Sequence, residues 1–405
     1  MSAVPVVELG GVTTKVGSGA TPRGGEAAYK PSGIPLIRSM NVHFDGFRRD
    51  GLAFLDEEQA RALKNVEVRA GDVLLNITGA SIGRVTVAPT AMDGARVNQH
   101  VCIIRPDQHL DSSFLRWYLA APSQQRLING IESGATRQAL TKEKILGFEV
   151  PLFPLSRQRE IVAEIEKQLS RLDDAVANLK RVKANLKRYR ASVLADAVEG
   201  DLAGDRAEWR NVHLGDIAIS VRNGISIKPV GESGTRILRI SAVRPMTLDL
   251  DDVRYLGQPL DNFDSFRLAA GDVVFTRYNG SVDLVGVCAA VPELLEPTVY
   301  PDKLIRIRVP SDVLLPAFLV IAASTGEGRA FIGSRIRTTA GQAGVSGADI
   351  KGIPLRVPPL AVQRRIVAEV DRHLSIIREV EAEVDANLKR AQALRQAVLA
   401  RAIRG

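Results

Sequence analysis

The sequence repeats itself at an interval of 205 residues, and this duplication constrains the fold more than any other feature. Residues 154–170 read PLSRQREIVAEIEKQLS and residues 359–375 read PLAVQRRIVAEVDRHLS, with ten of the seventeen positions identical. Other matches keep the same order along the chain, as between Gly71-Asp72-Val73 and Gly271-Asp272-Val273. An ordered series of matches over the full length indicates two homologous halves, about 1–200 and 206–405. Both halves must therefore fold on one common scaffold.

The first part of each half predicts a mixed α/β (α+β) domain. Short apolar runs bounded by turn residues are typical of strands, and apolar residues at helical spacing are typical of helices. In the first half we expect strands over 34–38, 72–77, 84–88 and 99–105, and helices over 56–65 and 112–121. In the second half we expect strands over 235–240, 272–277, 285–291 and 303–309. The two globular domains are predicted to span 1–153 and 206–358.

The second part of each half predicts one long helix, over 154–200 and over 359–405. Pro154 and Pro359 suit a first helical turn, and no further proline or glycine occurs before Gly200 and Gly405. Apolar residues recur at intervals of seven: Ile165, Leu172, Leu179, Leu186 and Val193, then Val370, Ile377, Val384, Ala391 and Val398. With apolar companions in the intervening turns, the mean spacing is about 3.5 residues, the period of a coiled coil. An ordinary amphipathic core helix is the alternative, and the length of the repeat argues against it.

The connectivity predicts that the two helices pair antiparallel. About 43 residues at about 1.5 Å each give a rod of roughly 65 Å. A domain of about 150 residues has a radius of gyration near 15 Å, so it does not easily connect points that far apart. An antiparallel pair brings the end of the first helix beside the start of the second. We therefore expect a dumbbell of two homologous globular domains separated by an antiparallel coiled coil, with pseudo-twofold symmetry.

The charge favours a protein that binds a polyanion, and the missing motifs favour one that is not itself catalytic. The net charge is +8 and the pI is about 9.6, as is common among proteins that bind nucleic acid. No phosphate-binding loop, dinucleotide fingerprint, nucleophile elbow or histidine pair at metal-ligand spacing occurs, so we expect neither catalytic residues nor a metal. Cys102 and Cys288 lie in apolar stretches and are expected to be buried free thiols in a reducing cytoplasm. No signal peptide and no apolar run of transmembrane length is visible.

The repeated PLxxQRxIVAE element, placed between a mixed α/β domain and a long heptad helix, resembles the specificity subunits of type I restriction–modification systems. The stretches GDVLLNITGASIGRV (71–85) and NQHVCIIRP (98–106) also resemble the pattern of their target-recognition domains. The second domain departs from this pattern, with RYNGSVDLVG at 277–286 and YPDKLIRI at 300–307. The resemblance covers essentially the whole chain.

This resemblance implies a non-catalytic subunit that reads a bipartite, gapped sequence in double-stranded DNA. Each target-recognition domain would read one half-site, and the helices would set the spacing and dock two DNA-methylation subunits. Restriction and translocase subunits would join the full complex, and no membrane would be involved. The chain would hold no cofactor, because S-adenosylmethionine, ATP and Mg would belong to the partner subunits. A coiled-coil scaffold that binds proteins rather than DNA is the alternative function.

Residues shared by both halves cannot encode two different half-sites, so base contacts are expected in polar loops where the halves differ. The candidates combine arginine, asparagine, glutamine and other polar side chains. In the first domain they are Ser81, Arg84, Asn98, Gln99, Arg137 and Gln138; in the second they are Arg222, Asn223, Arg277, Tyr278, Asn279, Lys303 and Gln342. For any single one of them, an ordinary surface position in a loop is the alternative, and it is favoured over a base contact. Arg38 and Arg239 are shared, and either a phosphate contact or an ion pair at the edge of the core would explain them.

Two features of the helices allow more than one interpretation. A run of cations without an intervening acid could be a solvated face, or could lie near DNA or an acidic partner: Lys180, Arg181, Lys183, Lys187, Arg188 and Arg190. His373 lies beside the apolar stripe of the second helix, where a polar contact that fixes register or docking is favoured over catalysis.

Overall fold

The computed structural model describes residues 4–22, 24–130, 139–202, 208–339 and 341–404. The chain divides into two compact units, Met1–Lys180 with Asp385–Gly405, and Arg181–Val384. Each unit therefore combines one globular domain with a segment of each long helix.

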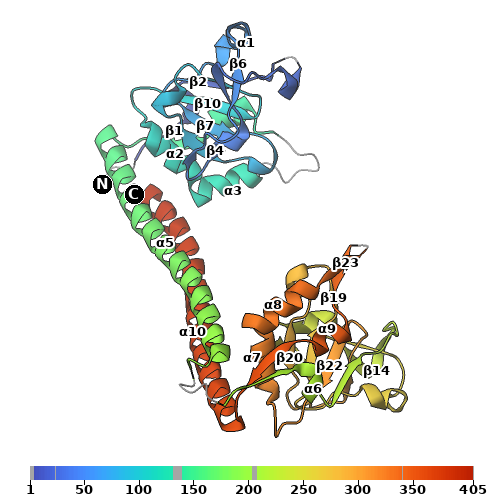
Figure 1. The fold of residues 1–405 in the computed structure, drawn as a ribbon. Coiled ribbons are helices and arrows are strands. Elements are labelled where there is room, and N and C mark those ends of the chain that lie inside the picture. Colours follow the sequence, from blue (N-terminus) through green and yellow to red (C-terminus); the bar gives the residue numbers. More distant parts are fainter. Residues whose placement is uncertain (1–3, 23, 131–138, 203–207, 340, 405) are drawn as a thin grey trace. The chain divides into compact units, whose positions relative to one another are not determined.

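The first unit is built on an antiparallel four-stranded sheet in the order β2-β10-β7-β8 (Figure 1). A three-stranded sheet, β6-β3-β9, and two strand pairs, β1-β11 and β4-β5, complete the strands. The strands of this unit are β1 Val6–Glu8, β2 Thr13–Ser18, β3 Ile34–Ile37, β4 Val42–His43, β5 Gly46–Phe47, β6 Ala53–Leu55, β7 Val73–Asn76, β8 Val85–Val87, β9 Arg96–Val97, β10 Val101–Pro106 and β11 Glu149–Pro151. Its helices are α1 Glu57–Ala62, α2 Ser112–Ala120, α3 Pro122–Gly130, α4 Lys142–Leu146 and the first part of α5 Leu155–Glu199.

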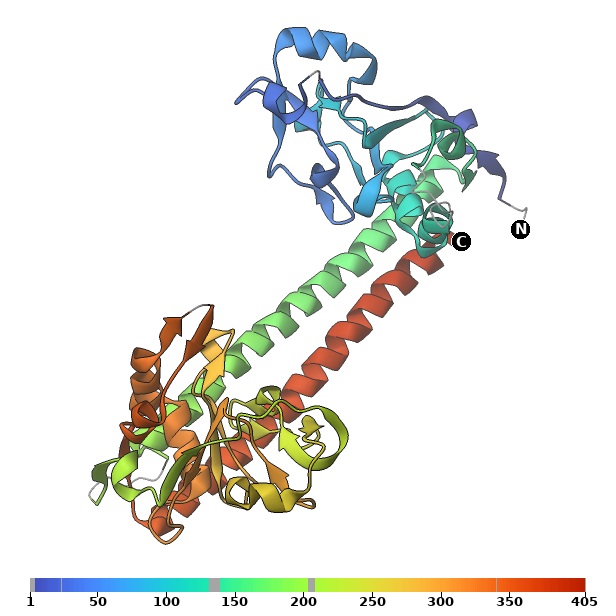
Figure 2. The same cartoon turned by 90° about the vertical axis from the view of Figure 1, so that its right-hand side faces the viewer.

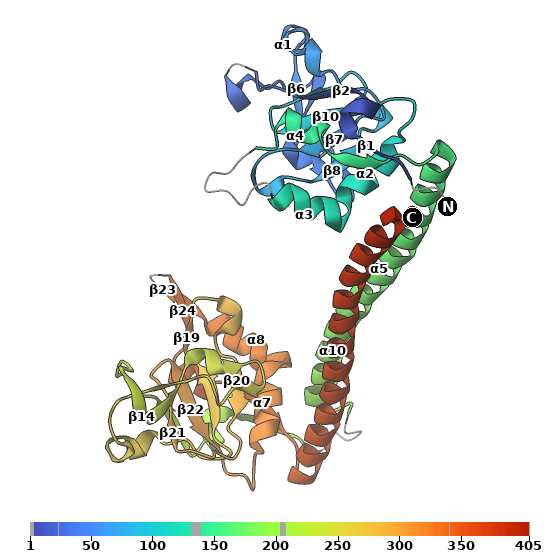
Figure 3. The ribbon, with the colours of Figure 1, turned by 180° about the vertical axis from the view of Figure 1, so that it is seen from behind.

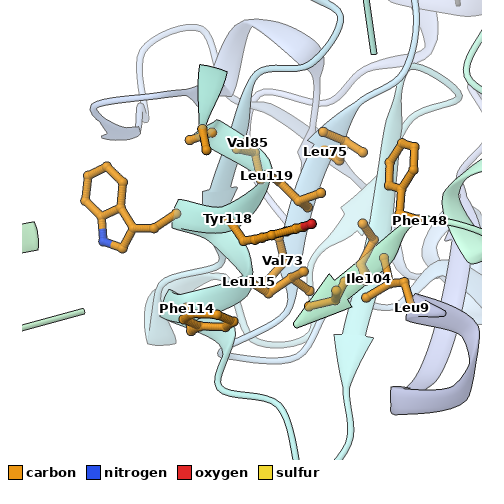
Figure 4. Packing of buried hydrophobic residues seen from close by; sticks show 14 of the residues in the cluster. Leu9, Val73, Leu75, Val85, Ile104, Phe114, Leu115, Tyr118, Leu119 and Phe148 are labelled. Carbon is orange, nitrogen blue, oxygen red and sulfur yellow. The ribbon is translucent and has the colours of Figure 1, made fainter. Parts of the chain in front are cut away.

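Alternate residues of the central strands face two separate cores in this unit. Val73 and Leu75 of β7 lie in one core, together with Phe114 and Leu115 of α2 (Figure 4). Leu74, between them, faces the other core, beneath the smaller sheet. Because both faces of the sheet are covered, β7 is a run of buried residues without polar alternation.

The second unit repeats this plan and adds a three-stranded sheet, β19-β24-β23, that has no counterpart among the described residues of the first unit. Its four-stranded antiparallel sheet has the order β13-β22-β18-β20, and its other three-stranded sheet has the order β17-β14-β21. Figure 3 shows α7 and α8 beside this sheet, where α2 and α3 lie in the first unit. The strands are β12 Arg210–His213, β13 Ser220–Asn223, β14 Gly231–Leu238, β15 Val243–Arg244, β16 Thr247–Leu248, β17 Val253–Tyr255, β18 Val273–Thr276, β19 Tyr278–Asn279, β20 Cys288–Ala290, β21 Thr298–Val299, β22 Leu304–Arg308, β23 Arg337–Thr339, β24 Gln342–Gly344 and β25 Pro354–Val357. The helices are α6 Leu214–Ile217, α7 Pro316–Ser324, α8 Gly326–Arg335, α9 Gly347–Lys351 and α10 Leu360–Arg404, of which the last part belongs to the first unit.

The common topology confirms the two homologous mixed α/β domains that the duplication predicts. The two long helices begin and end within one residue of the predicted 154–200 and 359–405. The strand expected over 285–291 is shorter, because Gly286 has a φ of 69° and forms a turn before β20. The helix expected over 56–65 ends at Ala62 and continues as a 3-10 turn over Lys64–Val66. The division into four segments at 153, 200, 206 and 358 stays a prediction.

Within each unit, the segments of α5 and α10 pack side by side and run antiparallel (Figure 2). In the first unit, Leu399 near the end of α10 packs with Ile161 and Ile165 near the start of α5. In the second unit, Val193 and Ala197 near the end of α5 pack with residues at the start of α10. The predicted antiparallel pairing is therefore confirmed within both units, while the dumbbell and its symmetry stay predictions.

Only part of the predicted apolar stripe is fully buried in these helix pairs. Ile165, Val193, Val370, Ile377, Val384 and Ala391 are buried. Several apolar companions remain exposed instead: Val182, Tyr189, Val380 and Leu394. His373 makes the polar contact that its position suggests, since Tyr189 Oη lies 2.7 Å from its Nδ1 in the same unit.

Candidate nucleic-acid interface

A buried carboxylate–arginine pair holds the same turn in both domains. Asp72 is 1% exposed and lies 2.7 Å from Arg105 Nε, and it also accepts the backbone N–H of Arg69. Asp272 is 2% exposed and lies 2.6 Å from Arg308 Nε. The preceding glycines have φ values of 87° and 86°, a left-handed conformation that favours glycine. The shared Gly-Asp-Val elements therefore belong to the scaffold.

The shared arginines at the ends of β3 and β14 form ion pairs in both domains. Arg38 Nη1 lies 2.9 Å from Glu26, and its Nη2 donates to the carbonyl oxygen of Gly51 at 2.6 Å. Arg239 Nη1 lies 3.1 Å from Asp252, and 47% of its side chain remains exposed. The ion-pair explanation thus describes the geometry of Arg38 best, whereas the more open Arg239 can also meet a phosphate.

The candidate residues of the first domain lie in loops of differing exposure. Asn98 is only 5% exposed, and its Oδ1 accepts the backbone N–H of His100, so its side chain mainly holds the turn. Gln99 is exposed and its Oε1 contacts Thr21 Oγ1. Ser81 and Arg84 are half-buried at the turn between β7 and β8. Arg137 and Gln138 lie outside the described residues.

Most candidates of the second domain are brought together around one small sheet, β19-β24-β23 (Figure 1). Tyr278 pairs with Gly344 in this sheet, and Asn279 pairs with Ala343. Gln342 is exposed on β24, next to the turn that joins it to β23. The Arg277 guanidinium lies 4.7 Å from the centre of the Tyr278 ring, and its backbone N–H donates to the carbonyl oxygen of Lys303 at 2.7 Å. Five candidates from three distant stretches of sequence thus share one edge of the domain.

Arg222 and Asn223 end strand β13 and are exposed. Arg222 donates to the carbonyl oxygen of Ser265 at 3.1 Å, and its guanidinium stacks 4.2 Å from the centre of the Phe266 ring. The loop that follows β13 returns to 301–303, because Asp302 donates its backbone N–H to the carbonyl oxygen of Ile225. These two residues therefore lead into the region that holds Lys303.

A pocket of about 450 Å³ in the second domain collects cations that the sequence did not single out. Its lining includes Arg239 and Lys303, which were candidates, and adds Lys228 and Arg254. All four side chains are exposed, and Asp302 is the acidic residue of the lining. Lys228 and Arg254 escaped notice because they come from a loop and a strand far apart in sequence. The sequence offered one signal for each of them, a positively charged residue within a polar stretch.

Within the described residues, the structure shows neither a reactive cysteine nor a cluster of metal ligands. Burial raises the pKa of Cys102 and of Cys288 to about 12, so both thiols stay protonated, as expected for buried free cysteines. Across the residues that are described, no three histidine, cysteine or acidic side chains gather as a metal site would require. No helix in the described part of the chain is both long and apolar enough to span a bilayer.

Comparisons with known proteins agree with this geometry. The family model for the type I restriction modification DNA specificity domain matches residues 1–188. The specificity subunit of the type I restriction enzyme EcoKI from Escherichia coli K12 is 30% identical over 395 residues, which cover 92% of this chain and 82% of that protein. The chain belongs to the type I restriction enzyme specificity subunits.

Further relatives support this family. The StySPI specificity subunit of Salmonella potsdam is 24% identical over 383 residues, covering 92% of this chain and 82% of the relative. The HsdS subunit from Thermoanaerobacter tengcongensis has the same fold, with a TM-score of 0.65, 18% identity, and coverage of 99% and 96%. A chain from a structure that describes assembly and conformational transition of a type I restriction–modification system gives a TM-score of 0.76 at 18% identity, with both chains fully covered. The chain is thus a specificity subunit with DNA-recognition domains rather than a catalytic subunit, and the scaffold alternative is not favoured.

Proposed function

We propose that each globular domain reads one half of a bipartite, gapped sequence in duplex DNA, and that α5 and α10 set the spacing between the halves. The observation that carries this proposal is the pairing of one topology with two different sets of polar loop residues. A common scaffold presents its loops in the same way twice, while different side chains on those loops select different bases.

In the second domain, the sheet β19-β24-β23 has the form of a DNA-reading element. A β-ribbon fits the major groove, where glutamine and asparagine suit adenine and arginine suits guanine. Gln342 is exposed on this ribbon, and 76% of the Arg337 side chain is exposed beside it. The cationic pocket around Arg239 and Lys303 suits the phosphate backbone, which supplies affinity without sequence information.

A stripe of matching exposed residues on both helices supports the docking of two copies of one partner. Positions spaced i, i+4, i+7 and i+11 lie on one helical face. The stripe is exposed in both helices and consists of Arg159, Ala163, Glu166 and Ser170 on α5, and Arg364, Ala368, Asp371 and Ser375 on α10. Arg159 and Arg364 make no ion pair within the described residues. Because packing does not explain why exposed residues match in halves that have diverged, we infer that two copies of one methylation subunit bind there.

The same proposal places the chemistry in those partners. S-adenosylmethionine would bind the methylation subunits, and ATP and Mg would bind the restriction and translocase subunits. The methylation subunits and the restriction and translocase subunits would act with this chain on DNA in the cytoplasm. The exposed apolar side chains Val182, Tyr189 and Val380 offer further surface for a partner helix.

DNA reading is tested with Gln342→Ala in the complex with its methylation partners. Loss of one base contact should weaken binding to the selected DNA by about 1–3 kcal/mol and relax selectivity at one base pair of a single half-site. Gln258→Ala, at an exposed glutamine of the same domain, is the matched control. Wild-type binding should also weaken steeply as salt rises. A DNA affinity that depends neither on salt concentration nor on duplex sequence would disprove the proposal.

Docking is tested by reversing the shared charges. Arg159→Glu and Arg364→Glu should each remove one methylation subunit from the purified complex, and the double variant should remove both. Arg171→Glu is the control, because Arg171 is exposed on α5 and the second half has Ile376 at the equivalent position. Native mass spectrometry counts the subunits. An unchanged count in the double variant would contradict this docking face.

A further inference from the structure

Gln158 is a fully buried glutamine on the second turn of α5, in the element that both halves share. Its Oε1 accepts the backbone N–H of Asp111 at 2.8 Å. Its Nε2 donates to the carbonyl oxygens of His109 at 2.8 Å and Phe153 at 2.7 Å. The acceptor and both donor hydrogens of the amide are therefore used, all on backbone groups.

Gln363 repeats this arrangement on α10. It is also fully buried, and its Oε1 accepts the backbone N–H of Leu315 at 2.8 Å. Its Nε2 donates to the carbonyl oxygens of Val313 at 2.9 Å and Pro358 at 2.8 Å. Asp111 and Leu315 are the N-cap residues of α2 and α7, so each glutamine joins a long helix to the equivalent helix start in its own domain.

These hydrogen bonds fix an orientation that apolar contacts alone leave loose. Ile161 and Ile165 also join α5 to its domain, but apolar contacts are non-directional and tolerate small rotations. A buried amide with three hydrogen bonds tolerates little rotation, because each lost bond leaves a desolvated backbone group unpaired. The glutamine thus sets the angle at which each domain is held on its helix.

We propose that Gln158 and Gln363 are positioning residues that determine which half-site spacing the subunit accepts. This inference rests on the proposed reading of two half-sites. Each domain presents its reading loops at an angle fixed by its glutamine, so a small rotation at either junction shifts where that domain meets the DNA. Neither glutamine contacts a base.

The test uses Gln158→Met, Gln363→Met and the double variant in the complex with the methylation subunits. Duplexes carry the sequence selected by the wild-type complex, with the gap lengthened or shortened by one and two base pairs. We expect the preference of the double variant for the native gap to fall about tenfold, as when directional bonds are replaced by non-directional packing. Selectivity for the bases within each half-site should remain, which simple loss of folded protein would not produce.

Gln168→Met and Gln392→Met are matched controls, because both glutamines are exposed on the same two helices. If the methionine variants do not fold, Gln158→Asn and Gln363→Asn, which keep a shorter amide, decide the question in the same assay. An unchanged gap preference, or a proportional loss at every gap and base, would overturn the inference. A wild-type complex without any gap preference would instead overturn the proposed function.

Discussion

Among single residues, the buried carboxylate of Asp72 makes several polar contacts that hold a turn of the first domain. It is buried and bonded to both Nε and Nη2 of Arg105, whose side chain is 18% exposed. Removing one partner of a buried pair is costly, because the other charge stays desolvated. The equivalent pair in the second domain indicates that the turn needs this interaction wherever the fold is used.

We expect Asp72→Ala to lower the free energy of unfolding of the first domain by about 3 kcal/mol. The chain contains two tryptophans, Trp117 and Trp209, so a Trp209→Phe background reports on the first domain by fluorescence during urea unfolding. Asp45→Ala removes an exposed ion pair with Arg48 and should cost at most about 1 kcal/mol. Equal costs for the two variants would contradict the buried-pair argument.

The two cysteines should react only when the protein unfolds. Their pKa is raised from 9.0 to about 12 by burial, so at pH 8 the reactive thiolate is about a thousand times scarcer in the folded than in the unfolded chain. The protection should diminish as the pH rises towards 12. Alkylation by iodoacetamide, followed by mass spectrometry with and without denaturant, measures this difference. Rapid modification of the folded protein at pH 8 would disprove it.

Partners of individual side chains were the least predictable part of the molecule. Arg38 was recognised as shared and charged, but its partner Glu26 and the carbonyl of Gly51 come from loops with no periodic signal. Gln158 was visible as one of ten identities, yet its burial depends on loops that the fold brings to it. Such contacts form across distances in sequence that composition and periodicity do not encode.

Among the elements, the long helices were the most predictable. A seven-residue apolar repeat without proline or glycine is a local signal, and it places both ends of α5 and α10 within one residue. Short strands such as β19 and β23 carry no comparable pattern, because they depend on pairing with β24. The small sheet that gathers the candidates of the second domain was therefore not foreseen.

Lengthening both helices tests their proposed role as a spacer. Inserting seven residues into each, after Leu179 and after Val384, preserves the apolar repeat and adds about 10 Å. We expect the preferred gap between half-sites to grow by about three base pairs, at about 3.4 Å each. Methylation motifs mapped in cells that carry the longer subunit report the gap. A matched insertion of seven residues in only one helix breaks the pairing and should abolish selective binding, whereas an unaltered gap in the double insertion would exclude a spacer role.

At the scale of the whole molecule, the boundary between the compact units does not follow the boundary between the sequence halves. Residues 385–405 complete the first unit, where Leu399 packs against Ile165 and Arg395 pairs with Asp173 at 2.5 Å. The duplication predicts two domains, but it does not show that each compact unit includes a helix segment from the other half of the sequence. That exchange follows from the antiparallel pairing.

Deleting residues 385–405 should therefore loosen the first unit and spare the second. We expect the amide hydrogens of 155–170 to exchange faster by about tenfold or more, because they lose their helix partner, while those of 366–370 remain protected. Hydrogen exchange with mass spectrometry resolves the two regions. Deleting only Arg404 and Gly405 is the control. Unchanged exchange in 155–170 would show that this segment needs no partner.

Because the first unit includes a helix segment from the second half of the sequence, the two units are completed in a fixed order during translation. Residues 1–180 emerge before residues 181–384, but the helix pair of their unit stays incomplete until residues 385–405 have been synthesised. Residues 181–384 form a continuous segment and are complete earlier. The first unit is thus the later of the two to be completed, and the face of α5 that packs against Leu399 stays uncovered until then.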